Sequence, residues 1–267
     1  YTCSRHKWVE RPMASTDNKM TGKIRLYISE DLNENRNCTL NKSQHHYLRN
    51  VMRCQPGEHI LVFNGRDGEW LAEISKLDKK SALIQAQIQT RLQTFAPDIH
   101  MLFAPVKKAR LDYMVQKATE MGAASLTPVL TQYTQKARLN YERLKANMVE
   151  AAEQCNLLQV PQLNDPIDLE LALEKLSETL PSRSLVFCDE GAGPILTKAS
   201  RQALEAMNNK PVAILIGPEG GFSPAERQKL HNRPDTLAIS LGPRILRADT
   251  ALVAALSLCQ MTLGDWV

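Results

Sequence analysis

Short stretches of alternating apolar and polar residues fill positions 23–92, a pattern typical of strands with one buried face. The pattern predicts four strands, separated by turn signals: Arg25–Ser29, Glu58–Phe63, Gly68–Ser75 and Ser81–Ile88. Between the first two strands, a helix is predicted at Ser43–Met52, with Ser43 as its N-cap and Tyr47, Leu48 and Val51 on one face. We therefore expect positions 23–92 to form a small β-rich barrel with one inserted helix.

After Pro97 the pattern changes, because apolar runs now alternate with amphipathic helical segments. This βαβ order is typical of a parallel sheet. We therefore place a domain boundary here and expect an α/β domain at positions 98–267. The predicted strands are Ile99–Val106, Leu185–Cys188, Val212–Gly217 and Leu237–Leu241; the predicted helices include one that ends at Gly122, then Leu139–Leu158, Leu169–Leu180 and Ala251–Met261.

Composition narrows the class of protein only slightly. The chain has 33 Lys and Arg against 29 Asp and Glu, so its net charge is +4, which is mildly basic. Its six cysteines form no C-x-x-C pair and have no histidine at metal-ligand spacing, so we expect no metal site and no disulfide framework. No apolar run reaches the roughly 18 residues of a membrane span. We expect a soluble, cytoplasmic protein in which positions 1–22 are an upstream or disordered segment without a functional role.

Two loops of the second domain are candidates for a ligand site, because ligands of parallel sheets bind beyond the carboxyl ends of the strands. The loop after Val212–Gly217 has three glycines, which allow the backbone to approach a ligand closely. Ser223-x-x-Glu226, with Pro224 at the first helical position, predicts a capping box. Taken alone, this segment would also suit an ordinary strand-to-helix turn.

In the loop after the last strand, Arg244 and Arg247 flank Ile245 and Leu246. A solvated basic turn with Asp249 as a helix cap would also explain this loop by itself. The chain contains no G-x-G-x-x-G, G-x-x-x-x-G-K-[ST] or G-x-S-x-G motif, which argues against dinucleotide-binding folds, P-loop enzymes and hydrolases. The two loops together therefore favour a ligand site of another kind.

The segments ILIGPEGGFSPAE (Ile214–Glu226) and LGPRILRADTA (Leu241–Ala251) closely resemble the ribosomal RNA small subunit methyltransferase E family. The resemblance extends from Ile24 onward and also includes His45–Trp70, Lys107–Gly122, Glu150–Cys155 and Phe187–Glu190. It implies an α/β protein: a C-terminal SPOUT-type parallel sheet with a trefoil knot, preceded by an N-terminal PUA-like β-barrel. The chain departs from the family at Ala248-Asp249, at Asn156-Leu157 and near Thr131, where Tyr133 stands and an arginine is expected.

The resemblance also implies an activity, namely methylation of uracil N3 in small-subunit ribosomal RNA by a homodimer that uses S-adenosylmethionine. It places the cofactor in a pocket lined by Asp189, Ile216, Gly217, Gly221, Leu241, Gly242, Ile245 and Leu246. Two other functions stay open: a non-catalytic RNA-binding factor for ribosome assembly, and a SPOUT enzyme that methylates the ribose 2′-OH of transfer RNA.

Uracil N3 must lose its proton as it attacks the methyl group, so the reaction needs a proton acceptor and stabilisation of negative charge. We assign charge stabilisation to Arg247, and Glu219 or Asp249 could accept the proton. Adjacent histidines on a helix diverge, so His45 and His46 suit RNA contacts better than metal binding. The candidate RNA-binding residues are His45, His46, Arg49, Arg53, Lys107, Lys108 and Arg110.

Overall fold

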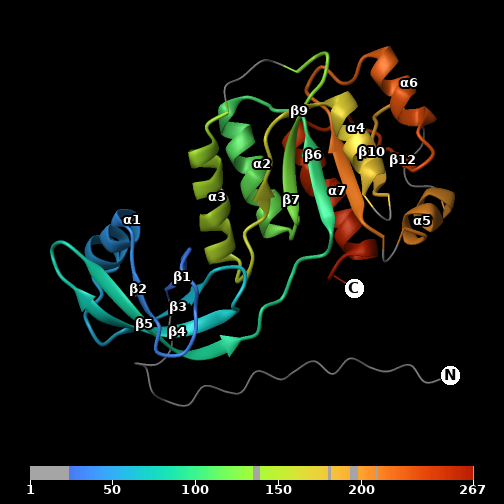
Figure 1. The fold of residues 1–267 in the computed structure, drawn as a ribbon. Coiled ribbons are helices and arrows are strands. Elements are labelled where there is room, and N and C mark those ends of the chain that lie inside the picture. Colours follow the sequence, from blue (N-terminus) through green and yellow to red (C-terminus); the bar gives the residue numbers. More distant parts are fainter. Residues whose placement is uncertain (1–23, 135–138, 180–181, 193–197, 208–209, 267) are drawn as a thin grey trace, which may run out of the picture.

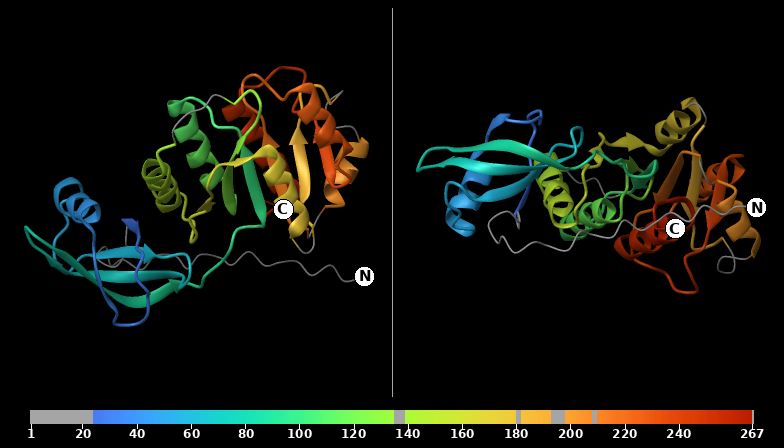
Figure 2. Two further views of the ribbon diagram at one scale, coloured as in Figure 1. Left: turned by 45° about the horizontal axis from the view of Figure 1, so that its top comes forward. Right: turned by 90° about the horizontal axis from the view of Figure 1, so that it is seen from below.

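The computed structural model describes residues 24–134, 139–179, 182–192, 198–207 and 210–266. The segment at positions 1–22, expected from the sequence to be upstream or disordered, lies outside these ranges. The described residues form two sheets that lie side by side and are joined by an extended segment between β5 and β6 (Figures 1 and 2). No helix in the described ranges is long and apolar enough to cross a membrane.

The first sheet is curled and has the strand order β1-β3-β4-β5-β2. Its β1 and β3 run parallel, and the other neighbours are antiparallel. A buried cluster that includes Leu48, Ile60 and Ile84 fills its inside. The strands are β1 (Arg25–Tyr27), β2 (Asn37–Thr39), β3 (His59–Phe63), β4 (Glu69–Leu77) and β5 (Ala82–Arg91). The four predicted strands are present, while the polar three-residue β2 was not predicted.

The inserted helix differs from the prediction at both ends. Its N-cap is Asn41, which forms a capping box with Gln44, so Ser43 lies inside α1 (Lys42–His46). A π-helical turn, Tyr47–Val51, follows. Because a π turn holds more residues than an α turn, it rotates Val51 away from the core. Val51 is consequently 58% exposed. The predicted apolar face is therefore wrong at Val51 and correct at Leu48 and Tyr47.

The second sheet has the order β12-β10-β11-β6-β7-β8, with β9 paired to β7, and every pairing is parallel. Its strands are β6 (Ile99–Phe103), β7 (Ser125–Leu130), β8 (Gln162–Leu163), β9 (Ile167–Asp168), β10 (Ser184–Cys188), β11 (Val212–Ile216) and β12 (Thr236–Ile239). The pattern did not predict β7, because Pro128 interrupts the apolar run and proline is rare inside a sheet.

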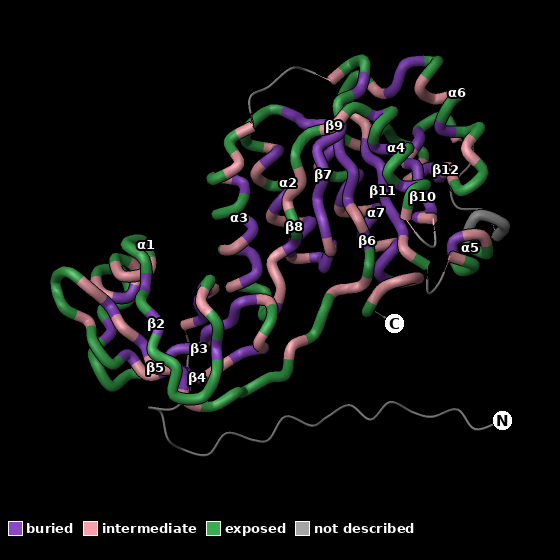
Figure 3. Tube along the Cα trace, viewed as in Figure 1, coloured by how far each residue is buried: buried purple, intermediate pink, exposed green. Residues whose placement is uncertain are grey.

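Helices cover both faces of this sheet, and Figure 3 shows the buried residues concentrated along its strands. The cluster on one face contains Met101 of β6 and Ile214 of β11 together with residues of α2, α3 and α7. Leu102 and Leu215, one position along, face α4 and α6. The helices are α2 (Lys108–Glu120), α3 (Tyr141–Gln154), α4 (Leu169–Glu178), α5 (Lys198–Glu205), α6 (Pro224–Asn232) and α7 (Ala248–Leu263).

The first sheet is attached to the C-terminal end of α3. Arg25 of β1 is buried, and its guanidinium donates to the main-chain oxygen of Ala152 at 2.7 Å. The N–H of Tyr27 donates to the carboxylate of Glu153 at 2.9 Å. Because the carbonyl groups at the end of a helix carry partial negative charge, the arginine is favoured there. The contacts fix the orientation of the first sheet against the second domain.

Candidate active site

The carboxyl ends of β10, β11 and β12 lie next to one another, because these three strands are neighbours in the order β12-β10-β11. Each is followed by a segment singled out from the sequence: Asp189-Glu190 after β10, Gly217–Phe222 after β11, and Ser240–Arg247 after β12. Parallel sheets bind their ligands at this edge. The fold therefore brings together segments that are far apart along the chain.

A small hollow of about 70 Å³ lies between the segments after β10 and β12. It is lined by Cys188, Asp189, Glu190, Ser240, Leu241, Gly242, Arg244, Ile245, Leu246 and Ala251. Five of the eight predicted cofactor residues are among them. Burial raises the pKa of the Cys188 thiol well above its ordinary value, so this cysteine lines the hollow as an uncharged thiol.

The other three predicted cofactor residues belong to β11 and its glycine loop. Ile216 is buried at the end of the strand. A β-carbon added to Gly217 would lie 2.5 Å from the ring of Phe222, so the loop closes tightly only with glycine there. A β-carbon on Gly221 would lie 3.4 Å from Glu190 Oε1, which places this loop against the segment after β10. The capping box predicted for Ser223 and Glu226 is confirmed at the start of α6.

Asp189 is held by α6, a relationship that the sequence did not reveal. Its carboxylate is buried, and Oδ2 lies 2.9 Å from His231 Nε2. Oδ1 lies 3.2 Å from a guanidinium nitrogen of Arg227 and accepts the Gly191 N–H at 3.0 Å. Both oxygens are thus engaged within the protein. Asp189 therefore forms a clamp between the end of β10 and α6, the helix that follows the glycine loop, and it also lines the hollow.

Glu219 and Arg110, predicted for different roles, form an ion pair. The guanidinium of Arg110 in α2 lies 3.1 Å from Glu219 Oε1 in the glycine loop, and both side chains are partly exposed. The neighbouring Lys107 is the N-cap of α2, and both Lys107 and Lys108 are exposed. The pair thus places a carboxylate of the glycine loop beside the basic start of α2.

Arg247 is the N-cap residue of α7, and its side chain is exposed. Among the described residues, no ion pair or side-chain hydrogen bond involves its guanidinium. Asp249 lies within the first turn of α7, where its carboxylate accepts the Thr250 N–H at 3.0 Å. The alternative of Asp249 as the helix cap is therefore wrong, because Arg247 occupies that position.

The basic residues of the first domain lie apart from those of α2. His45 and His46 belong to α1, Arg49 belongs to the π turn, and Arg53 follows it. The His45 ring nitrogen lies 2.9 Å from the main-chain oxygen of Asp78, and the ring of His46 contacts Asn50. Figures 1 and 2 show α3 between α1 and α2. An RNA that contacts both groups must therefore span both domains.

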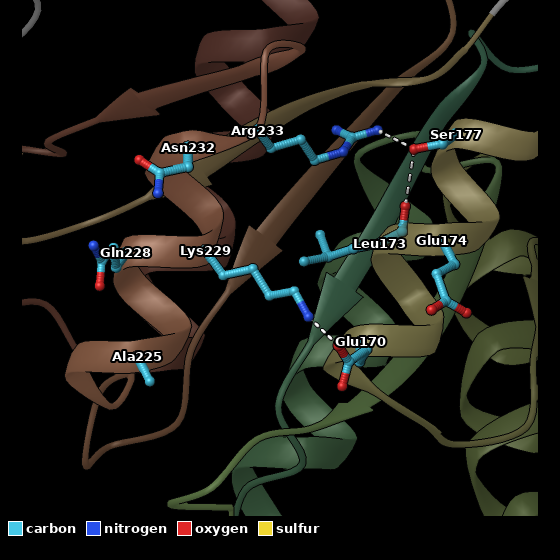
Figure 4. Close-up of a pocket in the computed structure, with 9 residues that line it drawn as sticks. All are labelled: Glu170, Leu173, Glu174, Ser177, Ala225, Gln228, Lys229, Asn232 and Arg233. Carbon is cyan, nitrogen blue, oxygen red and sulfur yellow. Dashed lines mark hydrogen bonds and ion pairs between the residues drawn. The ribbon is translucent and has the colours of Figure 1, made fainter.

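A larger groove, of about 580 Å³, lies between α4 and α6 (Figure 4). One wall carries Glu170 and Glu174, and the other carries Lys229 and Arg233. The groove shares no residue with the hollow between the β10 and β12 segments. Because it has neither a glycine loop nor a strand end in its lining, the three strand-end loops remain the candidate site.

Comparison with known proteins identifies the family to which this chain is similar. Residues 94–260 match the family model of an RNA methyltransferase domain, and residues 40–87 match that of an RNA methyltransferase PUA domain. The ribosomal RNA small subunit methyltransferase E of Rickettsia conorii is 30% identical, over 87% of this chain and 93% of its own length. The protein of the same name from Bacillus subtilis is 27% identical, over 79% of this chain and 85% of its own length.

Solved structures agree with these matches. A Legionella pneumophila protein, solved with the cofactor SAM bound, superposes with a TM-score of 0.77 and 28% identity, over 91% of this chain and 98% of that one. The methyltransferase E of Neisseria gonorrhoeae, bound to S-adenosyl methionine, has the same fold, with a TM-score of 0.75 and 23% identity, over 91% of this chain and 99% of that one. The predicted α/β class, with a PUA-like first domain and a SPOUT-type parallel sheet, is confirmed. The chain belongs to the ribosomal RNA small subunit methyltransferase E family.

Proposed function

We propose that this protein transfers a methyl group from S-adenosylmethionine to N3 of a specific uridine in small-subunit ribosomal RNA. The observation that carries the proposal is the meeting of three loops at the ends of β10, β11 and β12. The names of the relatives support the substrate, and SAM in the Legionella protein supports the cofactor. We assign RNA binding to positions 23–92, and cofactor binding and chemistry to positions 98–267, in which we expect the family's trefoil knot.

The residues at the three loops fit S-adenosylmethionine. Gly217, Gly221 and Gly242 present backbone groups without side chains, and Leu241 and Leu246 offer apolar surface to an adenine ring. The hollow of about 70 Å³ is smaller than the roughly 300 Å³ at which small-molecule pockets begin, so we expect the Ser240–Arg247 segment to move when the cofactor binds. Ile245 is 88% exposed and has room to close over a ligand.

When bound, S-adenosylmethionine supplies an electrophilic methyl group on a sulfonium centre. The protein must then position N3, accept its proton and stabilise the charge that spreads to the uracil oxygens. We assign proton acceptance to Glu219, because its partly exposed carboxylate lies in the glycine loop, held 3.1 Å from the Arg110 guanidinium. Asp249 is the alternative acceptor. Arg247 has five N–H donors and no described partner, so it can bind a uracil oxygen or a phosphate.

RNA binding is assigned to two groups of basic residues. Four belong to the first domain and three to the start of α2: His45, His46, Arg49 and Arg53, then Lys107, Lys108 and Arg110. Each group can neutralise phosphates before any base is read. The buried Arg25 contacts keep the groups in a constant relative position, so we expect recognition of a folded RNA that reaches both.

We also propose a homodimer that forms through α7. Its inner face is buried and includes Leu252, Ala255 and Leu256. Its outer face carries Val253, Ala254 and Leu258 half-buried, and Met261 with 62% of its surface exposed. An apolar stripe of this spacing is typical of a helix that packs against a partner. Light scattering at micromolar concentration checks this, because a monomer mass would contradict it.

Incubation of small ribosomal subunits with labelled S-adenosylmethionine, followed by identification of the labelled nucleoside, tests the proposed activity. We expect N3-methyluridine. A ribose-methylated nucleoside in transfer RNA would favour the 2′-O-methyltransferase, and cofactor binding without transfer to any RNA would favour the assembly factor. Since ribosomes are the proposed substrate, we expect the protein in the cytoplasm.

A further inference from the structure

Tyr133, which follows β7, is an exposed aromatic residue at the edge of the glycine loop. Its side chain is 46% exposed. A β-carbon added to Gly220 would lie 3.3 Å from Tyr133 Cβ and 4.0 Å from its ring carbon Cδ2, so one edge of the ring rests against the glycine loop. The next residue of that loop toward β11 is Glu219, which pairs with Arg110. Tyr133 therefore lies against the residue that follows the proposed proton acceptor, and that acceptor pairs with one of the proposed RNA contacts.

The segment that carries Tyr133 is held in place on both sides. The Thr131 N–H donates to Thr134 Oγ1 at 2.8 Å, and the Thr134 N–H donates to the Thr131 oxygen at 3.1 Å, which closes a tight turn around Tyr133. The Gln132 N–H donates to Glu226 Oε1 at 2.7 Å. The other oxygen of Glu226 accepts the N-cap N–H of α6 at 2.8 Å. Tyr133 is thus attached to the start of α6 and is presented from a preorganised turn.

A ring in this place suits a nucleobase by its chemistry. An aromatic face stacks on a base, whereas cations around it neutralise phosphates. Stacking holds the face of a pyrimidine and leaves its edge free. N3 of uracil lies on that edge, and its attacking electron pair lies in the plane of the ring. A stacked uracil can therefore turn N3 toward the strand-end loops while it stays fixed.

We propose that Tyr133 is a base-binding residue that stacks on the target uracil during methyl transfer. The proposal rests on the proposed function, because it requires that the protein acts on a uridine. In this proposal one face of the Tyr133 ring contacts the base, while Gly220 packs against Tyr133. The hydroxyl group of Tyr133 has no part in it, so phenylalanine should serve nearly as well.

Three substitutions separate the ring from other properties of this side chain: Tyr133→Phe, Tyr133→Leu and Tyr133→Ala. The measurement is steady-state methyl transfer to small ribosomal subunits, with the subunit concentration varied to separate kcat from KM. We expect Tyr133→Ala to lower kcat/KM by roughly 5- to 150-fold, the range for loss of one base–aromatic stack, with a loss in kcat at saturation. Leucine should recover little, and phenylalanine should stay within a few-fold of the original protein.

Tyr113→Ala is the matched control, because Tyr113 is a tyrosine of similar exposure, 42%, whose ring lies 5.6 Å from Lys117 Nζ. It should leave kcat and KM nearly unchanged. Calorimetry with S-adenosylmethionine should give the same affinity for every variant and so shows that the cofactor site is intact. The inference is overturned if Tyr133→Ala matches the original protein, if leucine equals phenylalanine, or if only KM rises. If the original protein methylates no uridine, the proposed function itself fails.

Discussion

Arg25 and Glu69 form an ion pair of 2.6 Å in which both side chains are almost completely buried, with 6% and 5% of their surfaces exposed. The same guanidinium also donates to the end of α3 and lies 3.9 Å from the centre of the Phe63 ring. One side chain therefore satisfies a buried carboxylate in the first domain and helix carbonyl groups in the second. Arg25 therefore contributes both to the stability of the first sheet and to the orientation of that sheet against the second domain.

Replacing Arg25 tests this connection. Arg25→Met leaves Glu69 without its closest partner in a buried place, so we expect a loss of about 3–5 kcal/mol in the free energy of unfolding. Urea denaturation measures it. The matched control is Arg66→Ala, because Arg66 forms an ion pair with Asp31 in which 51% and 77% of the side-chain surfaces are exposed. That variant should unfold at nearly the same urea concentration as the original protein; equal losses in both variants would contradict the account.

The clamp around Asp189 predicts an effect on cofactor affinity. Asp189→Asn weakens the contacts with His231 and Arg227, so the distance between the loops after β10 and β11 is no longer held. We expect an affinity for S-adenosylmethionine that is roughly 10- to 150-fold lower, because one hydrogen bond to a charged group contributes about 1.5–3 kcal/mol. Calorimetry measures this. Glu170→Gln is the control, since Glu170 pairs with Lys229 on the groove side of α6. This variant should keep the affinity for S-adenosylmethionine unchanged.

Gly217 should tolerate no side chain while Phe222 keeps its place. In Gly217→Ala the added methyl would lie 2.5 Å from the phenylalanine ring, so the ring or the loop must shift. We expect a destabilisation of about 1–3 kcal/mol, the usual range for an overpacked site, together with weaker cofactor binding. Phe222→Leu in the same chain should restore part of both. If the double variant binds no better than Gly217→Ala, the clash is not the cause.

Stability should depend on pH through His100. Burial lowers the pKa of His100 from 6.5 to about 4, helped by the Arg183 cation and opposed by Asp98. Between these values the unfolded chain binds the proton and the folded chain does not, so the free energy of unfolding should fall as the pH drops from about 6.5 to about 4. Urea denaturation at several pH values measures the slope. His100→Gln should flatten it, whereas His46→Gln on the exposed side of α1 should not.

Arg247 is expected to act on RNA or on the developing charge, with little part in holding the cofactor. Arg247→Ala should keep the affinity for S-adenosylmethionine within a few-fold and lower methyl transfer by on the order of 10². Arg247→Lys should recover only part, because an ammonium group lacks the planar set of donors. Paired calorimetry and single-turnover transfer give the answer. A near-normal rate for the alanine variant would reduce Arg247 to a surface charge.

Local patterns predicted the elements of this fold well where one face is buried and the turn residues are distinctive. The capping box of Ser223 and Glu226 is present because both halves of that contact lie within four positions of the chain. The π turn after α1 has no comparable signal, so Val51 was assigned to the wrong face. The strand β7 was not predicted either, because Pro128 interrupts its apolar pattern and the position of β7 in the sheet depends on pairing with β6.

In the candidate site, too, local segments could be predicted and long-range contacts could not. The glycine loop and Leu241–Leu246 could be recognised from their residues, but the partners of Asp189 could not. Arg227 and His231 stand four positions apart on one face of α6, which is a usable signal for a shared contact. Their partner lies 42 positions before His231, and only the strand order β12-β10-β11 brings it there. Contacts set by sheet order need a structure.

We propose that the loops after β10, β11 and β12 together form a site for methyl transfer to a uridine. The most direct test of this proposal is to incubate small ribosomal subunits with labelled S-adenosylmethionine and the protein, and to map the labelled nucleotide. We predict one labelled position in the small-subunit RNA, identified as N3-methyluridine and strongly reduced with Arg247→Ala. Label on a ribose, on transfer RNA, or on no RNA at all would contradict this account.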